Sequence, residues 1–199
     1  MKPLKGFEDA KVIRGENTQL PKGGYIVQIK ACEEISRTSK KGNAYTRYDF
    51  SFDVAEGEYK DHFANVYKNS KDENKKWRGV HNEFIPQEGS QYYEDNLSKF
   101  KTMIVNFEES NPGFHWDWDE KKLVNKYIGI IYREEEFKAD DGNIKITTKP
   151  YIFLSVDSIR NGKYKVPPVK KLPENTTPAT TDFASFLPVS DDDDELPFS

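Results

Sequence analysis

The chain has 199 residues, of which 32% are charged, 35% hydrophobic and 14% aromatic. This length suits one folded domain with appendages, and the apolar content excludes a wholly disordered chain. The single cysteine, Cys32, excludes an intramolecular disulfide and a cysteine-based metal site, and its strand-like surroundings predict a small buried side chain. No apolar run approaches the roughly 20 residues of a membrane-spanning helix. The N-terminus lacks the apolar stretch of a signal peptide, so we expect a cytoplasmic protein without membrane contact.

Three β-strands are expected in the first third of the chain. From Gly24, the residues up to Ala31 alternate in the pattern of a strand, with Tyr25, Val27, Ile29 and Ala31 on one face. Residues 39–43 are typical of a hairpin connection. The second strand is the clearest, because its even-numbered residues Tyr48, Phe50, Phe52 and Val54 alternate with polar ones. A turn at residues 56–58 then leads into a third strand, predicted over residues 59–67.

The rest of the folded part is expected to contain a helix followed by two strands. Residues 68–90 are basic and typical of a loop. Residues 91–109 are predicted to be helical, because Leu97, Phe100, Ile104 and Phe107 have the spacing of an apolar helix face. A helical turn is possible over residues 120–125. Two strands are predicted over residues 126–138 and 143–159, joined at a turn of residues 140–142.

This order of elements predicts a mainly β protein built on an OB-fold. Three meandering strands, a helical insert between strands three and four, and a closing pair of strands form a five-stranded OB-fold barrel. Closing the sheet would also remove exposed strand edges. We assign this domain to residues 1–170.

Residues 171–199 have a different composition from the rest. They contain one lysine and seven carboxylates, a charge of −6, so the formal net charge of −4 leaves +2 for residues 1–170. The overall acidity therefore does not argue against a nucleic-acid-binding body. Because this segment is rich in Pro, Thr and Ser without periodicity, we predict a disordered tether.

The tether ends in five carboxylates and a small apolar plug, a pattern typical of a docking peptide. The carboxylates would be guided to a basic surface and the phenylalanine would fill a pocket there. A merely solubilising acidic tail is the alternative, although such a tail has no use for the plug. The expected partner-binding residues are Asp191, Asp192, Asp193, Asp194, Glu195, Leu196, Pro197 and Phe198.

The candidate DNA-binding residues lie outside the predicted core face and in the loops of the first three strands. Binding a single strand requires cations along the phosphates and flat side chains on which bases stack. Trp77 could instead plug one end of the barrel, and the outward face of Tyr45 is inferred from alternation, which one slip in register would reverse. Arg133, Lys145, Lys149 and Tyr151 are secondary candidates. The candidates are Arg37, Lys40, Lys41, Tyr45, Arg47, Lys60, Lys75, Lys76, Trp77 and Arg78.

The acidic ending resembles the C-terminal tip of bacterial single-stranded-DNA-binding proteins, in which several Asp residues precede a hydrophobic residue, Pro and Phe. Residues 41–45, 110–117, 133–137 and 165–168 are similar to such proteins of phages and mobile elements of Gram-positive bacteria. The resemblance implies an OB-fold that coats single-stranded DNA during replication or recombination and recruits host or phage proteins through its tip. The family usually ends on Phe, whereas here Ser199 follows, which moves the terminal carboxylate one residue away from the ring. Because cellular members are commonly tetramers, a homo-oligomer is a possible assembly.

Two other functions were weighed against DNA coating. A magnesium-dependent nuclease would need clustered carboxylates, for which only the pairs Asp117/Asp119 and Asp140/Asp141 are candidates. The three histidines are scattered, without zinc or triad spacing, and there is no glycine-rich phosphate loop, so we expect no enzyme, no cofactor and no metal. A protein-only adapter that uses the tail, with the barrel as a scaffold, remains the other alternative.

Overall fold

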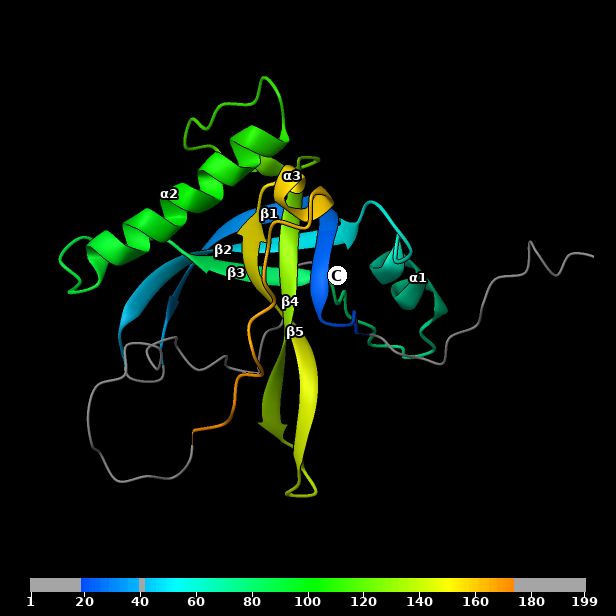
Figure 1. Ribbon diagram of the computed structural model, residues 1–199. Coiled ribbons are helices and arrows are strands. Elements are labelled where there is room, and N and C mark those ends of the chain that lie inside the picture. The colour runs from blue at the N-terminus through cyan, green and yellow to red at the C-terminus, as the bar shows by residue number, and fades with distance from the viewer. Residues whose placement is uncertain (1–18, 40–41, 174–199) are drawn as a thin grey trace, which may run out of the picture.

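The computed structural model describes residues 19–39 and 42–173, and its centre is a five-stranded antiparallel sheet (Figure 1). The strand order is β3-β2-β1-β4-β5, so β3 and β5 are the edges of an open sheet. This arrangement confirms a mainly β chain with five strands. The strands are β1 (Gly23–Thr38), β2 (Ala44–Val54), β3 (Val80–Phe84), β4 (Tyr127–Lys138) and β5 (Ile144–Leu154).

The helices are α1 (His62–Asn69), α2 (Tyr93–Ser110) and α3 (Val156–Arg160), with a short 3-10 helix, η1 (Glu120–Leu123). The predicted helix over residues 91–109 is confirmed as α2, which lies between β3 and β4 in the sequence. It buries Phe100, Met103, Ile104 and Phe107. Within the described part of the chain, no helix is both long and apolar enough to cross a membrane.

The prediction of a third strand over residues 59–67 is wrong. These residues form a turn and most of α1, because Tyr59, Phe63 and Tyr67 are spaced by four and therefore fit a helix as well as a strand. The buried carboxylate of Asp53 accepts hydrogen bonds from the backbone amides of Phe63 and Ala64 at 2.9 and 3.0 Å, which fixes the first turn of the helix. The third strand is instead β3, inside the segment that was predicted to be a loop.

A β-bulge in β1 changes which residues face the core. Val27 and Ile29 are fully buried, as the alternation predicts, but the pairing with β2 shifts between Ile29 and Ala31. After this bulge Cys32, rather than Ala31, occupies the core position and is 4% exposed. Burial raises the pKa of the Cys32 thiol, as expected of the small buried side chain that the sequence indicates.

The core is formed largely by aromatic rings between the sheet and α2. Phe50 from β2 contacts Phe107 of α2 and Phe153 of β5, with ring centroids 6.1 and 5.1 Å apart.

The last predicted strand was extended too far, to residue 159, because β5 ends at Leu154. The Ser155 hydroxyl there accepts a hydrogen bond from the Ser158 amide and begins α3.

The β4–β5 hairpin extends beyond the rest of the sheet (Figure 1). Residues 23–28 of β1 pair with residues 127–132 of β4, whereas the β4–β5 ladder continues to the pair Lys138 and Ile144. We call residues 133–149 the arm. The chain returns to it near residue 170, where Lys170 forms a parallel bridge with Glu135 and covers the edge of β4.

Candidate nucleic-acid interface

The candidate interface is the outer face of β1, β2 and β3, defined as the face of β2 opposite Tyr48, Phe50 and Phe52. Cross-strand pairing places side chains in rows on this face. Arg37 lies opposite Tyr45, and Arg47 lies between Ile35 and Phe84. Tyr45 and Arg47 are therefore on the predicted face.

The turn end of the β1–β2 hairpin combines a cation with two aromatic rings. The half-buried Tyr45 ring lies against Phe84, with centroids 5.3 Å apart. The Nε atom of Arg37 is buried and has no hydrogen-bond partner in the described part of the chain. The Arg37 guanidinium could donate charge-assisted hydrogen bonds to a phosphate. Lys40 and Lys41, predicted beside this end, lie outside the described residues.

The middle of the outer face is a buried polar network rather than an exposed cationic surface. Arg47 is 6% exposed and Asp49 is 1% exposed. Arg47 Nε lies 2.6 Å from Asp49 Oδ1, and Arg47 Nη2 donates to Asp49 Oδ2 at 3.2 Å. With its amide oriented to satisfy both neighbours, Asn82 donates to Asp49 at 3.0 Å and accepts from Arg47 at 3.2 Å. The expectation that Arg47 is an exposed cation is therefore wrong, because Asp49 holds it in the sheet.

The segment from residue 75 to residue 78 lies at the other end of β2, beside α1. Lys76 and Arg78 are exposed, and the ammonium group of Lys75 lies 4.6 Å from the centre of the Tyr67 ring. The Trp77 indole donates to the Phe52 carbonyl at 3.1 Å and packs against the core, which agrees with the alternative of a plug. Trp77 thus anchors this segment to β2 instead of offering an open ring.

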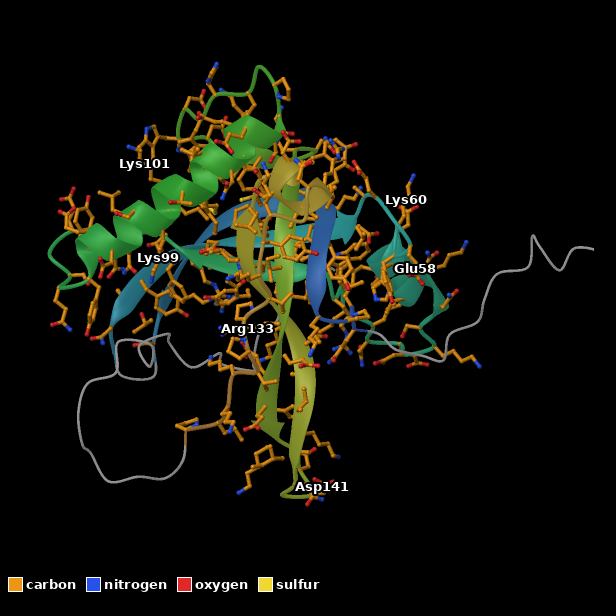
Figure 2. All side chains as sticks on the ribbon, viewed as in Figure 1. Glu58, Lys60, Lys99, Lys101, Arg133 and Asp141 are labelled. Atoms are coloured by element: carbon orange, nitrogen blue, oxygen red, sulfur yellow. The ribbon has the colours of Figure 1, made fainter. Side chains whose placement is uncertain are left out.

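Lys60 does not lie on a strand, contrary to the prediction. It belongs to the turn before α1, where its backbone amide donates to the Gly57 carbonyl at 3.2 Å. The placement of Lys60 on a strand is wrong for the same reason as the predicted third strand. It depended on a strand alternation over residues 59–67, where the chain forms a turn and a helix instead. Lys60 is exposed beside α1 (Figure 2), so it adds a cation to the same end of β2 as residues 75–78.

The two cationic groups therefore lie at opposite ends of β2. Tyr45 marks one end, and Phe52, which binds Trp77, marks the other. Seven residues of extended strand separate them, which corresponds to roughly 24 Å. Figure 1 shows the same separation, with α1 and the turn end of the β1–β2 hairpin on opposite sides of the sheet. This span is long enough for several nucleotides of a single strand.

The secondary candidates on the arm are largely occupied by their neighbours. The Arg133 guanidinium lies 4.1 Å from the centre of the Tyr151 ring and donates to Glu135 at 2.8 Å. Lys145 pairs with Asp141 at 2.9 Å. Lys149 is directly opposite Arg133. The arm thus offers less free positive charge than the sequence suggests.

The acidic pairs considered for a nuclease are also engaged. Lys122 contacts Asp117 and holds the pKa of that carboxyl below its usual value. Asp141 is held in the same way by Lys145. In residues 19–39 and 42–173 no group of three His, Cys, Asp or Glu side chains is arranged to hold a metal ion.

Three residues of this face were missed by sequence reasoning. Phe84 and Asn82 lie in β3, and Tyr67 lies on α1 beside Lys75. A signal for β3 was present, because residues 80–84 are bracketed by Gly79 and Pro86, which are typical of strand boundaries. The many lysines that precede this short strand favoured the interpretation of the whole segment as a loop.

The sequence matches no protein-family model, and no curated protein matches it. The predicted docking residues 191–198 lie outside the described residues.

Proposed function

We propose that this protein binds single-stranded DNA without sequence preference along the outer face of an OB-fold, and that it recruits replication or recombination proteins through residues 191–198. The observation that carries the proposal is the pair of cationic groups at the two ends of β2. Phosphates contact these ends, and bases stack on Tyr45 and Phe84 at one of them.

Three features support the OB-fold as the finer description of the sheet. The order β3-β2-β1-β4-β5 is that of an OB-fold barrel opened between its third and fifth strands. The two edges approach each other, since His81 of β3 and Phe153 of β5 have ring centroids 4.9 Å apart. Helix α2 comes between β3 and β4 and covers the core, as the predicted insert does.

The distribution of charge suggests how the strand is held. In the middle of the face the charge of Arg47 is neutralised by Asp49. The phosphates are therefore attracted by the cationic groups at the two ends of β2. One end has Arg37, with its unpaired Nε atom, beside Tyr45 and Phe84. These contacts involve phosphates and base faces rather than base edges, and binding of this kind does not depend on sequence.

The test is to remove the cations beside α1 and measure the salt dependence of binding. We expect the triple variant Lys75→Ala/Lys76→Ala/Arg78→Ala to bind oligo-dT more weakly. If each cation contacts one phosphate, the slope of log affinity against log salt should fall by about 2. Fluorescence anisotropy at several salt concentrations measures both quantities.

A matched control removes three exposed lysines elsewhere, through Lys99→Ala/Lys101→Ala/Lys121→Ala. Lys99 and Lys101 lie on α2 (Figure 2), away from the outer face, so this variant should keep the slope of the unmodified protein. Equal slopes for the two triple variants would contradict the proposed DNA path.

A further inference from the structure

We propose that a second copy of this chain pairs with the outer edge of β5 in the arm, joining two arms into one antiparallel sheet around a two-fold axis. The inference does not depend on nucleic-acid binding. It starts from Ile144 and Ile146, which are 63% and 58% exposed and lie on the same face of β5. Two exposed isoleucines on an edge strand form a template for another strand.

The outer edge of β5 is open at these residues. Within the described part of the chain β5 is the last strand of the sheet, and no strand covers this edge. The backbone amide of Thr148 points outward, because it donates to the Gln19 side chain at 3.3 Å. Alternate residues of a strand point their amides the same way, so Ile144 and Ile146 also present theirs outward. Gln19 covers the edge at Thr148, and among the described residues no strand pairs with the part nearer the tip.

The other edge of the arm is already covered. Glu136, which is directly opposite Ile146, donates its backbone amide to the Lys170 carbonyl at 2.9 Å. Its carboxylate accepts a hydrogen bond from the Leu172 amide at 3.1 Å. The chain therefore shields the β4 edge with its own backbone, and the unshielded edge is the one that carries the isoleucines.

The charges of the arm favour a second copy over a polyanion. The arm has four cations and five carboxylates, which gives a formal net charge of −1, and two close pairs form within it. Arg133 pairs with Glu135, and Lys145 pairs with Asp141. Asp140 and Asp141 at the tip (Figure 2 labels Asp141) would repel phosphates. A strand that is nearly neutral and rich in β-branched residues can pair with an identical strand without placing like charges opposite each other.

The sequence of β5 also selects a register. Centring the two-fold axis on Ile146 brings the two Ile146 side chains together and places Lys145 opposite Thr147 of the second copy. Centring it on Lys145 would oppose two lysines, which is destabilising. Centring it on Ile144 would bring the two Ile144 side chains together but place each Ile146 opposite Gly142, which has no side chain to contact. Centring it on Ile146 places each Ile144 opposite Thr148, so the Thr148 amide exchanges the Gln19 side chain for the second copy. We assign this register, because both isoleucines then face a side chain.

The first test is sedimentation velocity of the full chain over a concentration series. The unmodified protein should self-associate, whereas Ile144→Lys/Ile146→Lys should weaken association by about tenfold or more. Both side chains are more than half exposed, so the variant should retain its circular dichroism spectrum and melting temperature. Val105→Lys, at an exposed apolar position of α2, is the control and should associate normally.

The second test fixes the register by cross-linking. In the assigned register the two residues 146 form a hydrogen-bonded pair with Cα atoms about 5.5 Å apart, a distance that a disulfide can bridge. Ile146→Cys should form covalent dimers under mild oxidation, and Val105→Cys should not. The native Cys32 is buried and should not interfere.

Three results would each overturn the inference. One is an unmodified protein that stays monomeric throughout the concentration series. Another is equal self-association, or equal cross-linking, of the arm variants and their Val105 controls. The third is a loss of oligo-dT affinity in Ile144→Lys/Ile146→Lys without a change in assembly, which would assign the isoleucines to DNA instead.

Discussion

Arg47 and Asp49 are buried charged side chains on the outer face of β2, and each depends on the other. Removing two charges from water is costly, and their close contact at 2.6 Å offsets this cost only while both are present. The alternation in β2 correctly predicted the face of Arg47 but not its burial. Burial depends on Asn82 of β3, a strand that the sequence pattern did not reveal.

We predict that Asp49→Ala lowers the free energy of unfolding by about 3–5 kcal/mol, because Arg47 then remains buried without this carboxylate. The double variant Arg47→Met/Asp49→Leu should recover most of that loss, since neither charge is left behind. Urea denaturation of the two variants and the unmodified protein measures the difference. A double variant as unstable as Asp49→Ala would show that the charges do not act as a pair.

At the scale of elements, α1 is held to the sheet by a side chain from outside the helix. Asp53 in β2 is 3% exposed and accepts hydrogen bonds from the backbone amides of Phe63 and Ala64. These amides belong to the first turn of the helix, where no carbonyl of the helix itself can accept from them. Asp61, the residue before the helix, makes no side-chain cap hydrogen bond and has a left-handed φ of 57°. The sheet therefore supplies the cap, and α1 positions Tyr67 against Lys75.

Replacing Asp53 with Ala should destabilise the protein by about 2 kcal/mol, the upper end of the range for a lost helix cap, since it leaves the buried Phe63 amide without its acceptor. Asp61→Asn is the control and should have little effect, because Asn tolerates the left-handed conformation. Thermal unfolding of both variants provides the comparison. An Asp61→Asn loss equal to that of Asp53→Ala would refute the role of the sheet as the cap.

The elements differ in how well the sequence predicted them. The strand β2 and the helix α2 were predicted because their apolar residues follow one period over at least seven residues. The segment from Tyr59 to Tyr67 fits both periods, and the contact that decides between them comes from Asp53, which no local pattern can show. The bulge after Ile29 was equally invisible, because it depends on the pairing of β1 with β2.

At the scale of the whole molecule, one sheet has two exposed features with different charges. The outer face of β1, β2 and β3 has cations at both ends, whereas the arm is nearly neutral and presents Ile144 and Ile146. The sequence predicted most of the cations of the first feature. It did not predict the second, because the isoleucines alternate like those of any half-buried strand, and only the projection of the arm exposes them.

The central claim is that the outer face binds a single strand and not a duplex. The most direct measurement is a titration of the full-length protein against labelled oligo-dT and against a duplex of the same length, each at two salt concentrations. We expect binding to oligo-dT that weakens steeply with salt, with much weaker binding to the duplex. No binding to oligo-dT, or equal binding to both, would contradict single-strand binding by the outer face, and no binding at all would leave a protein-only adapter as the better description.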